Sequence, residues 1–323
     1  MRHEPGVGVT RREALGAAAA LGAACAAGVP RAAAEPAATG LKLRLGVSTL
    51  GFDQLTHAQL AQELTGERIR LVQLFLAQSD TRYWKYNGTS DVSTMTPDRC
   101  QAIAEAYRSA GITIHSIGVY TNFIHPQEAE RQAALAYFEA MMKVGADMGV
   151  RAFVTEAGHY PGGGPEPPVA HHFQEPVWAQ MVATFRKLAE AAARFDATVL
   201  LEPFFRSFLA TAKRTRVFLD EVGSPRVRAL LDPANLLEVN DLGEMFDQLG
   251  PRIDCLHAKD RKLHVDRGVP AGQGDLDYDA FLKLAAGRTP SAPVVLEYVG
   301  PKDYRAALAH VRAAMQRAGI GEA

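Results

Sequence analysis

The chain has 323 residues, of which 47% are hydrophobic and 22% are charged, and its formal net charge is −1. This composition is typical of a soluble globular protein with ample material for a core. The near-neutral charge argues against binding to nucleic acid or to a membrane through a basic surface. The length exceeds that of an ordinary single domain but is normal for an α/β barrel.

The first 34 residues are typical of an export signal rather than of a folded element. Paired arginines at Arg11 and Arg12 precede an apolar run rich in Ala and Leu, which ends in the small residues 32–34. This order predicts a signal peptide of the twin-arginine (Tat) type over residues 1–34, and hence a periplasmic or extracellular protein. The alternative is an alanine-rich tail without a fold of its own. The apolar run is too short for a good membrane span, so we expect no membrane association after signal removal.

After a linker over residues 35–41, we expect a single barrel domain over residues 42–323. Eight apolar runs with strand character recur at 43–50, 68–76, 112–120, 151–158, 198–205, 227–235, 253–260 and 293–300. Several of them are near-continuous in Val, Ile, Leu or Phe. Such runs are typical of parallel strands that are buried on both faces.

Helical patterns separate most of these runs. The segment 96–111 has Thr96 as its expected N-cap and ends at Gly111, and Asp277 is the expected N-cap of another helix. Similar patterns occupy 126–149, 176–195 and 303–319. Eight strands with interleaved helices predict a (β/α)8 TIM barrel. The alternative is an open, doubly wound sheet.

Two long loops follow the second and fourth predicted strands, over residues 77–95 and 159–176. Loops at the carboxyl ends of barrel strands are where substrate contacts are built. In the first loop, Tyr83, Trp84 and Tyr86 could form a wall on which a sugar ring stacks. The alternative is that these rings only pack the loop against the domain.

The last four predicted strands each carry a carboxylate or an imidazole near the strand end. Glu202, Asp232 and Glu297 each follow an apolar stretch, and His257 lies in the seventh run. Because successive strands are neighbours in a closed barrel, these side chains should converge at its carboxyl end. Three carboxylates in an apolar setting would repel one another, and a divalent cation removes that cost. The alternative for each acid is that it caps a helix or pairs with Arg or Lys.

The composition of this set indicates which ion it would hold. Three oxygen donors and one imidazole suit a moderately hard divalent cation. We therefore expect one ion bound by Glu202, Asp232, His257 and Glu297. Manganese is favoured, and the same ligands also suit cobalt, magnesium, iron or zinc.

Four motifs that contain these residues occur in a fixed order along the chain. They are LLEPF at 200–204, LLDPANL at 230–236, HAKDR at 257–261 with GQGDLDYDAF at 272–281, and VVLEYVG at 294–300. Together they resemble the sugar phosphate isomerase/epimerase family of xylose isomerase-like TIM barrels, which includes ketose 3-epimerases and hydroxypyruvate isomerases. The resemblance covers essentially the whole chain after the signal. It implies that the four residues are metal ligands, and that Glu202 and Glu297 also exchange the substrate proton.

Such a site suits the isomerisation or epimerisation of a keto-sugar through an enediolate. The ion would polarise the carbonyl, while one of Glu202 and Glu297 removes the neighbouring proton and the other returns one. Lys259 could stabilise the developing oxyanion, and its alternative role is a salt bridge with Asp260. Export argues for an unphosphorylated substrate, because sugar phosphates are cytoplasmic.

Six other residues near the predicted barrel mouth are candidates for substrate binding, namely Trp84, His115, Glu156, His159, Asn235 and Arg206. A lone His inside a strand, such as His115, is more often a hydrogen-bonded core residue. Arg206 could clamp a polar substrate group or only pair with an acid. We interpret the run 255–262 as the seventh strand leaving the core for the barrel mouth, with Arg261 as a loop charge.

Three other functions fit parts of this pattern. A metal-dependent lyase or hydrolase would cleave 3-keto-glycosides by β-elimination with the same metal and base. An abasic-site endonuclease would have a related fold, but the chain that remains after removal of residues 1–34 is more acidic, and this charge and the export signal argue against DNA. A non-catalytic sugar-binding barrel is the last alternative, and the intact Glu202 and Glu297 argue against it. We expect a small carbohydrate as the partner, and a homo-oligomer is compatible with the sequence.

Overall fold

The computed structural model describes residues 40–160 and 170–323. The predicted signal peptide over residues 1–34 lies outside the described residues, as do residues 35–39 of the predicted linker. Within the predicted barrel, only residues 161–169 of the second long loop are not described.

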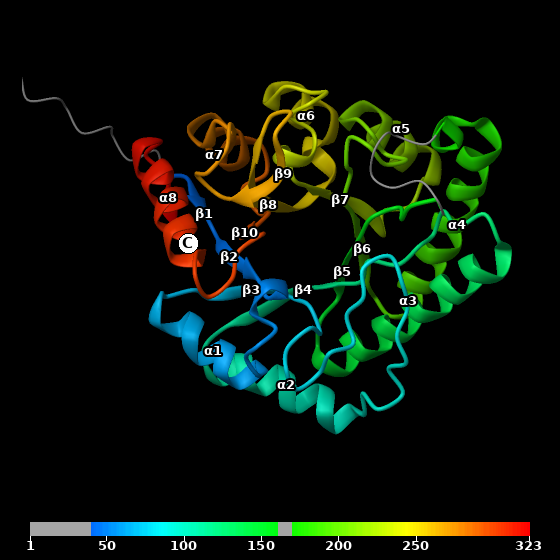
Figure 1. The fold of residues 1–323 in the computed structure, drawn as a ribbon, viewed down its shortest axis with the longest axis horizontal. Coiled ribbons are helices and arrows are strands. Elements are labelled where there is room, and N and C mark those ends of the chain that lie inside the picture. Colours follow the sequence, from blue (N-terminus) through cyan, green and yellow to red (C-terminus); the bar gives the residue numbers. More distant parts are fainter. Residues whose placement is uncertain (1–39, 161–169) are drawn as a thin grey trace, which may run out of the picture. The chain divides into compact units, whose positions relative to one another are not determined.

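Eight parallel strands close into a barrel within the described residues (Figure 1). In chain order they are β2 (Leu45–Ser48), β3 (Leu71–Leu74), β4 (Thr113–Gly118), β5 (Ala152–Thr155), β6 (Thr198–Leu201), β7 (Val227–Leu231), β8 (Ile253–Lys262) and β10 (Val294–Leu296). Each pairs with its neighbour in this order, and β10 pairs with both β8 and β2, which closes the ring. The predicted (β/α)8 barrel is confirmed, and the open, doubly wound alternative is wrong.

The strands are buried on both faces, which explains their near-continuous apolar sequences. In β6, Leu200 belongs to a small cluster with residues of β3, β5, β7, β8 and β10, whereas Val199 and Leu201 pack in a larger cluster that includes the helices. Each fully buried side chain of this kind contributes about 1.5–3 kcal/mol relative to its exposed state. The strand ends are therefore held by a packed scaffold on both sides.

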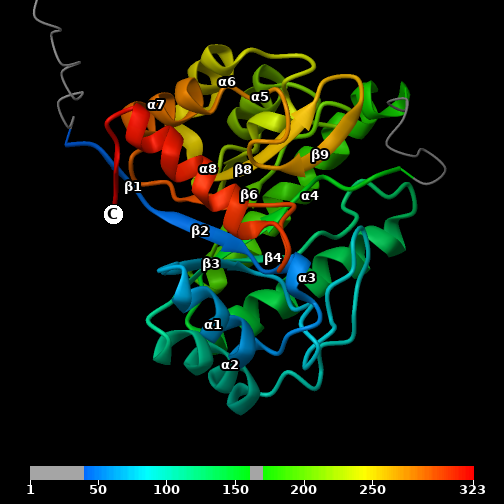
Figure 2. The same cartoon turned by 60° about the vertical axis from the view of Figure 1, so that its left-hand side comes forward.

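Helices cover the outside of the barrel (Figure 2). They are α1 (His57–Gly66), α2 (Pro97–Ser109), α3 (Glu128–Met148), α4 (Glu175–Arg194), α5 (Ala212–Val222), α6 (Leu242–Leu249), α7 (Tyr278–Arg288) and α8 (Tyr304–Arg317). The side chain of Thr96 accepts a hydrogen bond at the start of α2, and that of Asp277 does so at the start of α7, so both predicted N-caps are confirmed. Among the helices of the described ranges, none has the length and apolar character needed to cross a membrane.

Two short strand pairs add to the barrel. Strand β1 (Lys42–Leu43) pairs in parallel with β11 (Gly321–Glu322), which joins the two ends of the described chain. Strand β9 (Asp266–Pro270) pairs antiparallel with the extended end of β8. The charged end of the seventh predicted strand therefore continues as a hairpin instead of turning into an irregular loop.

This hairpin corrects the interpretation of Arg261 as a loop charge. Arg261 is only 1% exposed, and its Nη1 lies 3.0 Å from Oε1 of Glu238. The guanidinium also lies over the ring of Phe205, 4.6 Å from the ring centroid. A charged side chain is rarely buried unless it is paired, and this pairing lets Arg261 pack inside the hairpin base.

Asp260 is buried beside Arg261 and shapes the turn after β9. Its carboxylate accepts hydrogen bonds from the backbone N–H groups of Arg261, Gly272 and Leu276, at 2.8, 3.1 and 3.0 Å. Charge-assisted bonds of this kind are about twice as strong as neutral ones. The carboxylate of Asp260 is therefore engaged by the backbone.

We expect the stability of the fold to fall in mild acid because of His57 at the start of α1. Its ring is buried against Tyr107 and Thr81, and burial lowers its pKa from 6.5 to about 4. Because the unfolded chain then binds the proton more readily, stability is retained above pH 6.5 and lost as the pH falls toward 4. The loss for this residue should be on the order of 2 kcal/mol.

Urea unfolding at a series of pH values measures this loss. The variant His57→Gln should show a shallower decline in the free energy of unfolding between neutral pH and pH 4.5 than the natural chain. The exposed His264, changed to Gln, is the matched control for the removal of an imidazole. Equal slopes in the two variants would rule out His57 as a source of the acid sensitivity.

Candidate metal centre

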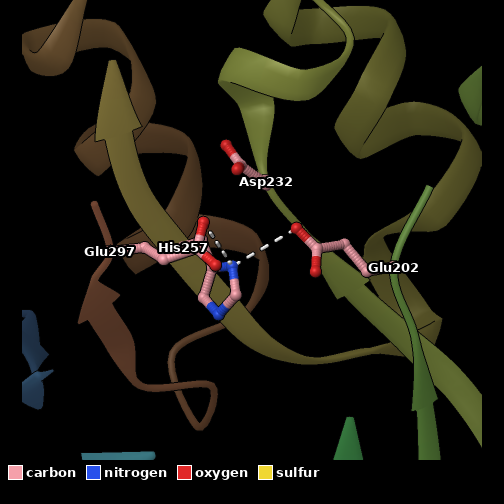
Figure 3. Close-up of side chains that lie close together, drawn as sticks. All are labelled: Glu202, Asp232, His257 and Glu297. Atoms are coloured by element: carbon pink, nitrogen blue, oxygen red, sulfur yellow. Dashed lines mark ion pairs between the residues drawn. The ribbon is translucent and has the colours of Figure 1, made fainter. Parts of the chain in front are cut away.

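Four side chains meet at the carboxyl end of the barrel (Figure 3). Glu202, Asp232 and Glu297 directly follow β6, β7 and β10, and His257 lies within β8. One potential ligand atom from each residue lies within 4.8 Å of the others. All four side chains are buried, with exposed fractions between 0% and 8%. The strand ends thus bring together the four residues that the sequence predicts as ligands.

His257 is oriented by Gln73 of β3, which is not among the predicted site residues. Its Nε2 lies 2.6 Å from Oε1 of Gln73. Because an amide oxygen only accepts, Nε2 carries the hydrogen, and Nδ1 faces Glu202 and Glu297 at 3.4 and 3.5 Å. Such a bond fixes the ring orientation and tautomer of a metal-binding histidine. The only sequence signal for Gln73 is a polar amide inside an otherwise apolar strand.

Lys259, also on β8, supplies positive charge to the same cluster. Its Nζ lies 2.7 Å from Oδ2 of Asp232 and 3.3 Å from Oε2 of Glu297. Burial alone would lower the pKa of Lys259, but Asp232 and Glu297 outweigh burial and raise it well above its ordinary value. The ammonium group therefore stays charged. The ion-pair partners of Lys259 are Asp232 and Glu297. The salt bridge with Asp260, which the sequence suggests as the alternative, is not formed between these described residues.

Glu202 is held by two hydrogen-bond donors. Tyr120 donates its hydroxyl to Oε2 at 2.5 Å, and Nδ2 of Asn235 donates to Oε1 at 2.8 Å. The side-chain oxygen of Asn235 accepts in turn from Nζ of Lys259 at 2.9 Å. Asn235 therefore links the acid on β6 to the cation on β8. Tyr120 was not predicted as a site residue, although it ends the third predicted strand run.

The two glutamates of the cluster have different electrostatic settings. Burial acts to raise the pKa of Glu202, but His257 and Lys259 outweigh it and leave the pKa below its ordinary value. Burial is the largest effect on Glu297 as well, and there it prevails, so the pKa of Glu297 is raised. Glu202 is therefore the better placed to be an ionised base, and Glu297 more readily carries a proton.

The four residues fit a divalent cation. Nδ1 of His257 is buried and has no hydrogen-bond partner among the described residues. Burial would lower the pKa of His257, but Glu297 and Glu202 raise it to about 9, so a metal ion must displace a proton from this nitrogen. One imidazole nitrogen with carboxylate oxygens on three sides is a donor set that manganese, cobalt, iron and zinc accept. This buried site could therefore bind a metal ion, and its donors leave the identity of the ion open.

A cavity of about 580 Å³ reaches this cluster. Glu202, Asn235, Lys259 and Glu297 form its polar side, and its aromatic lining consists of Phe75, Trp84, Tyr86, Tyr120, Phe204 and Tyr298. The volume lies in the range of small-molecule sites. Of the three aromatic residues predicted as a stacking wall, Trp84 and Tyr86 line the cavity. Tyr83 is not a lining residue and packs against the core.

Glu156 and His159 line the same cavity from the loop after β5. The hydroxyl of Tyr86 donates to Oε2 of Glu156 at 2.9 Å and lies 2.5 Å from Nε2 of His159. The backbone N–H of His159 donates to the side chain of Asn87 at 3.1 Å. The two loops predicted to carry substrate contacts thus meet at one side of the cavity.

Two predicted substrate contacts do not reach the cavity. His115 is half-buried in β4, where the pairing with β3 shifts register, and burial lowers its pKa to about 4. The guanidinium of Arg206 lies over the ring of Phe205, 4.8 Å from the centroid. Neither residue lines the cavity, whereas Arg267 of β9 does. The geometry therefore does not support direct substrate contact by His115 or Arg206.

We expect the variant His257→Ala to lose its bound divalent metal, because it removes the only nitrogen ligand of the cluster. Changing a residue that only orients a ligand typically costs 10–100-fold in metal affinity, so direct loss of the ligand should cost at least about 100-fold. Manganese titration by calorimetry and elemental analysis of the purified protein measure this effect. His264→Ala, at an exposed position, is the control. Equal metal content in the two variants would contradict the site.

Part of the chain is similar in sequence to a curated sugar phosphate epimerase. Over 125 residues, the chain is 25% identical to the probable L-ribulose-5-phosphate 3-epimerase UlaE of Mycoplasma pneumoniae, and the match spans 38% of this chain and 40% of that protein. The match therefore covers about two fifths of the relative's length. The resemblance to ketose 3-epimerases that the motifs indicate thus has a counterpart in sequence similarity over part of the chain.

Solved structures with the same fold cover most of the chain. The apo form of 3-keto-D-glucoside 4-epimerase YcjR from E. coli has a TM-score of 0.68 and 18% identity, covering 84% of this chain and 100% of that one. The IolI protein with a bound zinc atom has a TM-score of 0.66 and 17% identity, covering 85% and 98%. At these identities the likeness establishes the fold alone.

The family to which the chain belongs is shown by a match that covers more of its length. The family model described as xylose isomerase-like TIM barrel matches residues 70–314, which is well over half of the chain. The resemblance predicted from the four strand-end motifs is thereby confirmed. This chain belongs to the xylose isomerase-like TIM barrel family.

Proposed function

We propose that the protein is a divalent-metal-dependent isomerase or epimerase that acts on an unphosphorylated keto-sugar or a related carbohydrate. The observation that carries this proposal is the pair Glu202 and Glu297, which approach the same nitrogen of His257 from β6 and β10. Both glutamates also line the cavity, so both are accessible to one bound substrate.

The named relatives support the same reaction class. L-ribulose-5-phosphate 3-epimerase and 3-keto-D-glucoside 4-epimerase are both named for inverting a carbon next to a carbonyl. That inversion needs the removal of a proton from one face of the carbon and the delivery of a proton to the other. Two independently placed carboxyl groups on one cavity meet this need.

The residues of the cavity have separate roles in the proposed mechanism. A bound divalent ion, for which manganese is favoured, would polarise the substrate carbonyl and make the neighbouring C–H bond more acidic. Glu202 has the lowered pKa and takes this proton, and Glu297 has the raised pKa and delivers one. Lys259 stays charged and offers its ammonium to an oxygen on which negative charge develops. The side chain of Asn235 bonds to both Lys259 and Glu202 and so fixes their relative positions.

The remaining lining residues would orient the sugar. Trp84 meets Phe75 edge-on with their ring centroids 5.7 Å apart, so its ring is held in place and offers a surface to an apolar sugar face. Glu156 and His159 offer polar groups to sugar hydroxyls from the loop after β5. We further propose that the twin-arginine segment over residues 1–34 exports the protein to the periplasm or the exterior. A location outside the cytoplasm supports an unphosphorylated substrate, because sugar phosphates are cytoplasmic.

We expect Glu202→Gln and Glu297→Gln each to slow the exchange of the substrate α-proton by about 100-fold or more, since a general acid or base contributes about 10²–10⁴-fold. The measurement is deuterium incorporation from D₂O into a panel of free ketoses, followed by NMR, with the manganese-loaded protein. Glu190→Gln, on the exposed side of α4, is the matched control. Full exchange in either site variant would refute the two-base mechanism.

A further inference from the structure

Tyr298 has a backbone conformation that a bulky residue rarely adopts. It is the second residue after β10, and its φ of +57° lies in the left-handed region. An aromatic residue in this region costs free energy that glycine or asparagine would avoid, and such strain persists only where the surrounding structure enforces it. Strained residues of this kind cluster at functional sites, so Tyr298 is a candidate for contact with a ligand.

The neighbours of Tyr298 hold its ring in place. A side chain at Gly268 of β9 would collide with the ring, and a side chain at Gly51, which follows β2, would collide with the carbonyl oxygen of Val299. The ring also lies over the ammonium group of Lys259, whose Nζ is 4.5 Å from the ring centroid. The two glycines and the lysine thus fix a ring that lines the cavity and is not packed in the core.

Tyr86 has a matching place on the opposite wall of the cavity. Its ring centroid lies 6.3 Å from that of Tyr120, which follows β4, and its hydroxyl donates to Glu156, which follows β5. In the closed ring of eight strands, β4 and β5 lie opposite β8 and β10. Burial of its hydroxyl is the largest cause that raises the pKa of Tyr86, and Tyr298 adds to the rise, so the two phenols lie near each other.

The two tyrosines mark the outer end of the cavity. Tyr86 is 51% exposed and Tyr298 is 57% exposed. Glu202 and Glu297, at the metal cluster, are only 2% and 8% exposed. The inner part of the cavity has aromatic side chains of its own that pack in the small cluster inside the barrel, namely Phe75, Trp84 and Tyr120. A sugar at the metal cluster would contact this inner group, which leaves the outer pair for a part of the ligand beyond it.

We propose that Tyr86 and Tyr298 form an outer subsite that holds a second sugar ring, so that the substrate is a ketose linked to a further sugar unit. This inference rests on the proposed function, because the reacting ketose sits at the metal cluster. A tyrosine offers a large apolar face with a polar hydroxyl at its edge, which suits a sugar ring with an apolar face and a polar rim. The strained turn at Tyr298 has a reason in this role, because it holds the ring at the mouth of the cavity.

The test measures binding and needs no turnover. The manganese-loaded full chain is titrated by calorimetry with D-fructose and with ketose disaccharides that carry glucose on different oxygens of fructose, namely turanose, maltulose, leucrose and isomaltulose. We expect at least one disaccharide to bind about 10-fold more tightly than fructose. Tyr298→Asn should reduce this preference, given as the ratio of the two dissociation constants, by about 5-fold or more. Asparagine tolerates the left-handed backbone, so this change removes the ring without new strain.

The other variants separate the ring from its surroundings. Tyr298→Phe keeps the ring and should keep the preference within about 2-fold, whereas Tyr86→Leu should reduce it. His264→Asn is the matched control, because it removes an exposed ring from another left-handed residue, which does not line the cavity. The ratio of two dissociation constants cancels any difference in the fraction of folded protein.

The outcomes distinguish this inference from the proposed function. The inference would be overturned if the natural chain binds fructose as tightly as every disaccharide, or if the preference survives Tyr298→Asn or falls equally in His264→Asn. Intact deuterium exchange on ketoses would in that case leave the proposed function standing. A disaccharide preference without any exchange would overturn the proposed reaction and leave the outer subsite in place. Absence of binding by all of these sugars would overturn both.

Discussion

Three buried carboxylates within a few ångströms of one imidazole are the constraint on which the rest of this site depends. Such a cluster is costly without positive charge, because burial removes the water that would otherwise solvate each anion. Lys259 neutralises part of it through Asp232 and Glu297, and His257 another part when protonated. A divalent cation would replace the proton on His257 and satisfy the three acids together. The same charge balance then sets which glutamate is basic and which is acidic.

The barrel supplies the positions that this cluster requires. Four consecutive strands end side by side, and both faces of each strand are packed, so the side chains at the ends have little freedom. Residues outside the cluster complete it by holding its members. Gln73 orients the imidazole ring, Asn235 joins Glu202 to the ammonium group of Lys259, and Asp260 binds backbone donors near the hairpin. Packing and hydrogen bonds thus hold this end of the barrel in place below the loops.

The sequence predicts the barrel and the cluster well because both follow from periodicity. Apolar runs mark the strands, and a polar residue at a strand end must lie at the rim, which finds Glu202 and Asp232 without any knowledge of contacts. Contacts between loops have no such rule. The bond from Tyr86 to Glu156 joins two loops far apart in the chain, and the bond from Tyr120, which follows β4, to Glu202 also joins distant residues. For the same reason the sequence does not distinguish His115 and Arg206, which do not line the cavity, from the residues that do. The export signal stays a prediction.

The most direct test of the central claim is a crystal structure of the chain grown with excess Mn²⁺, with anomalous diffraction collected to locate the metal. We expect one ion per chain, bonded to Glu202, Asp232, His257 and Glu297 at the carboxyl end of the barrel. An empty cluster at saturating Mn²⁺, with Lys259 still between Asp232 and Glu297, would contradict it.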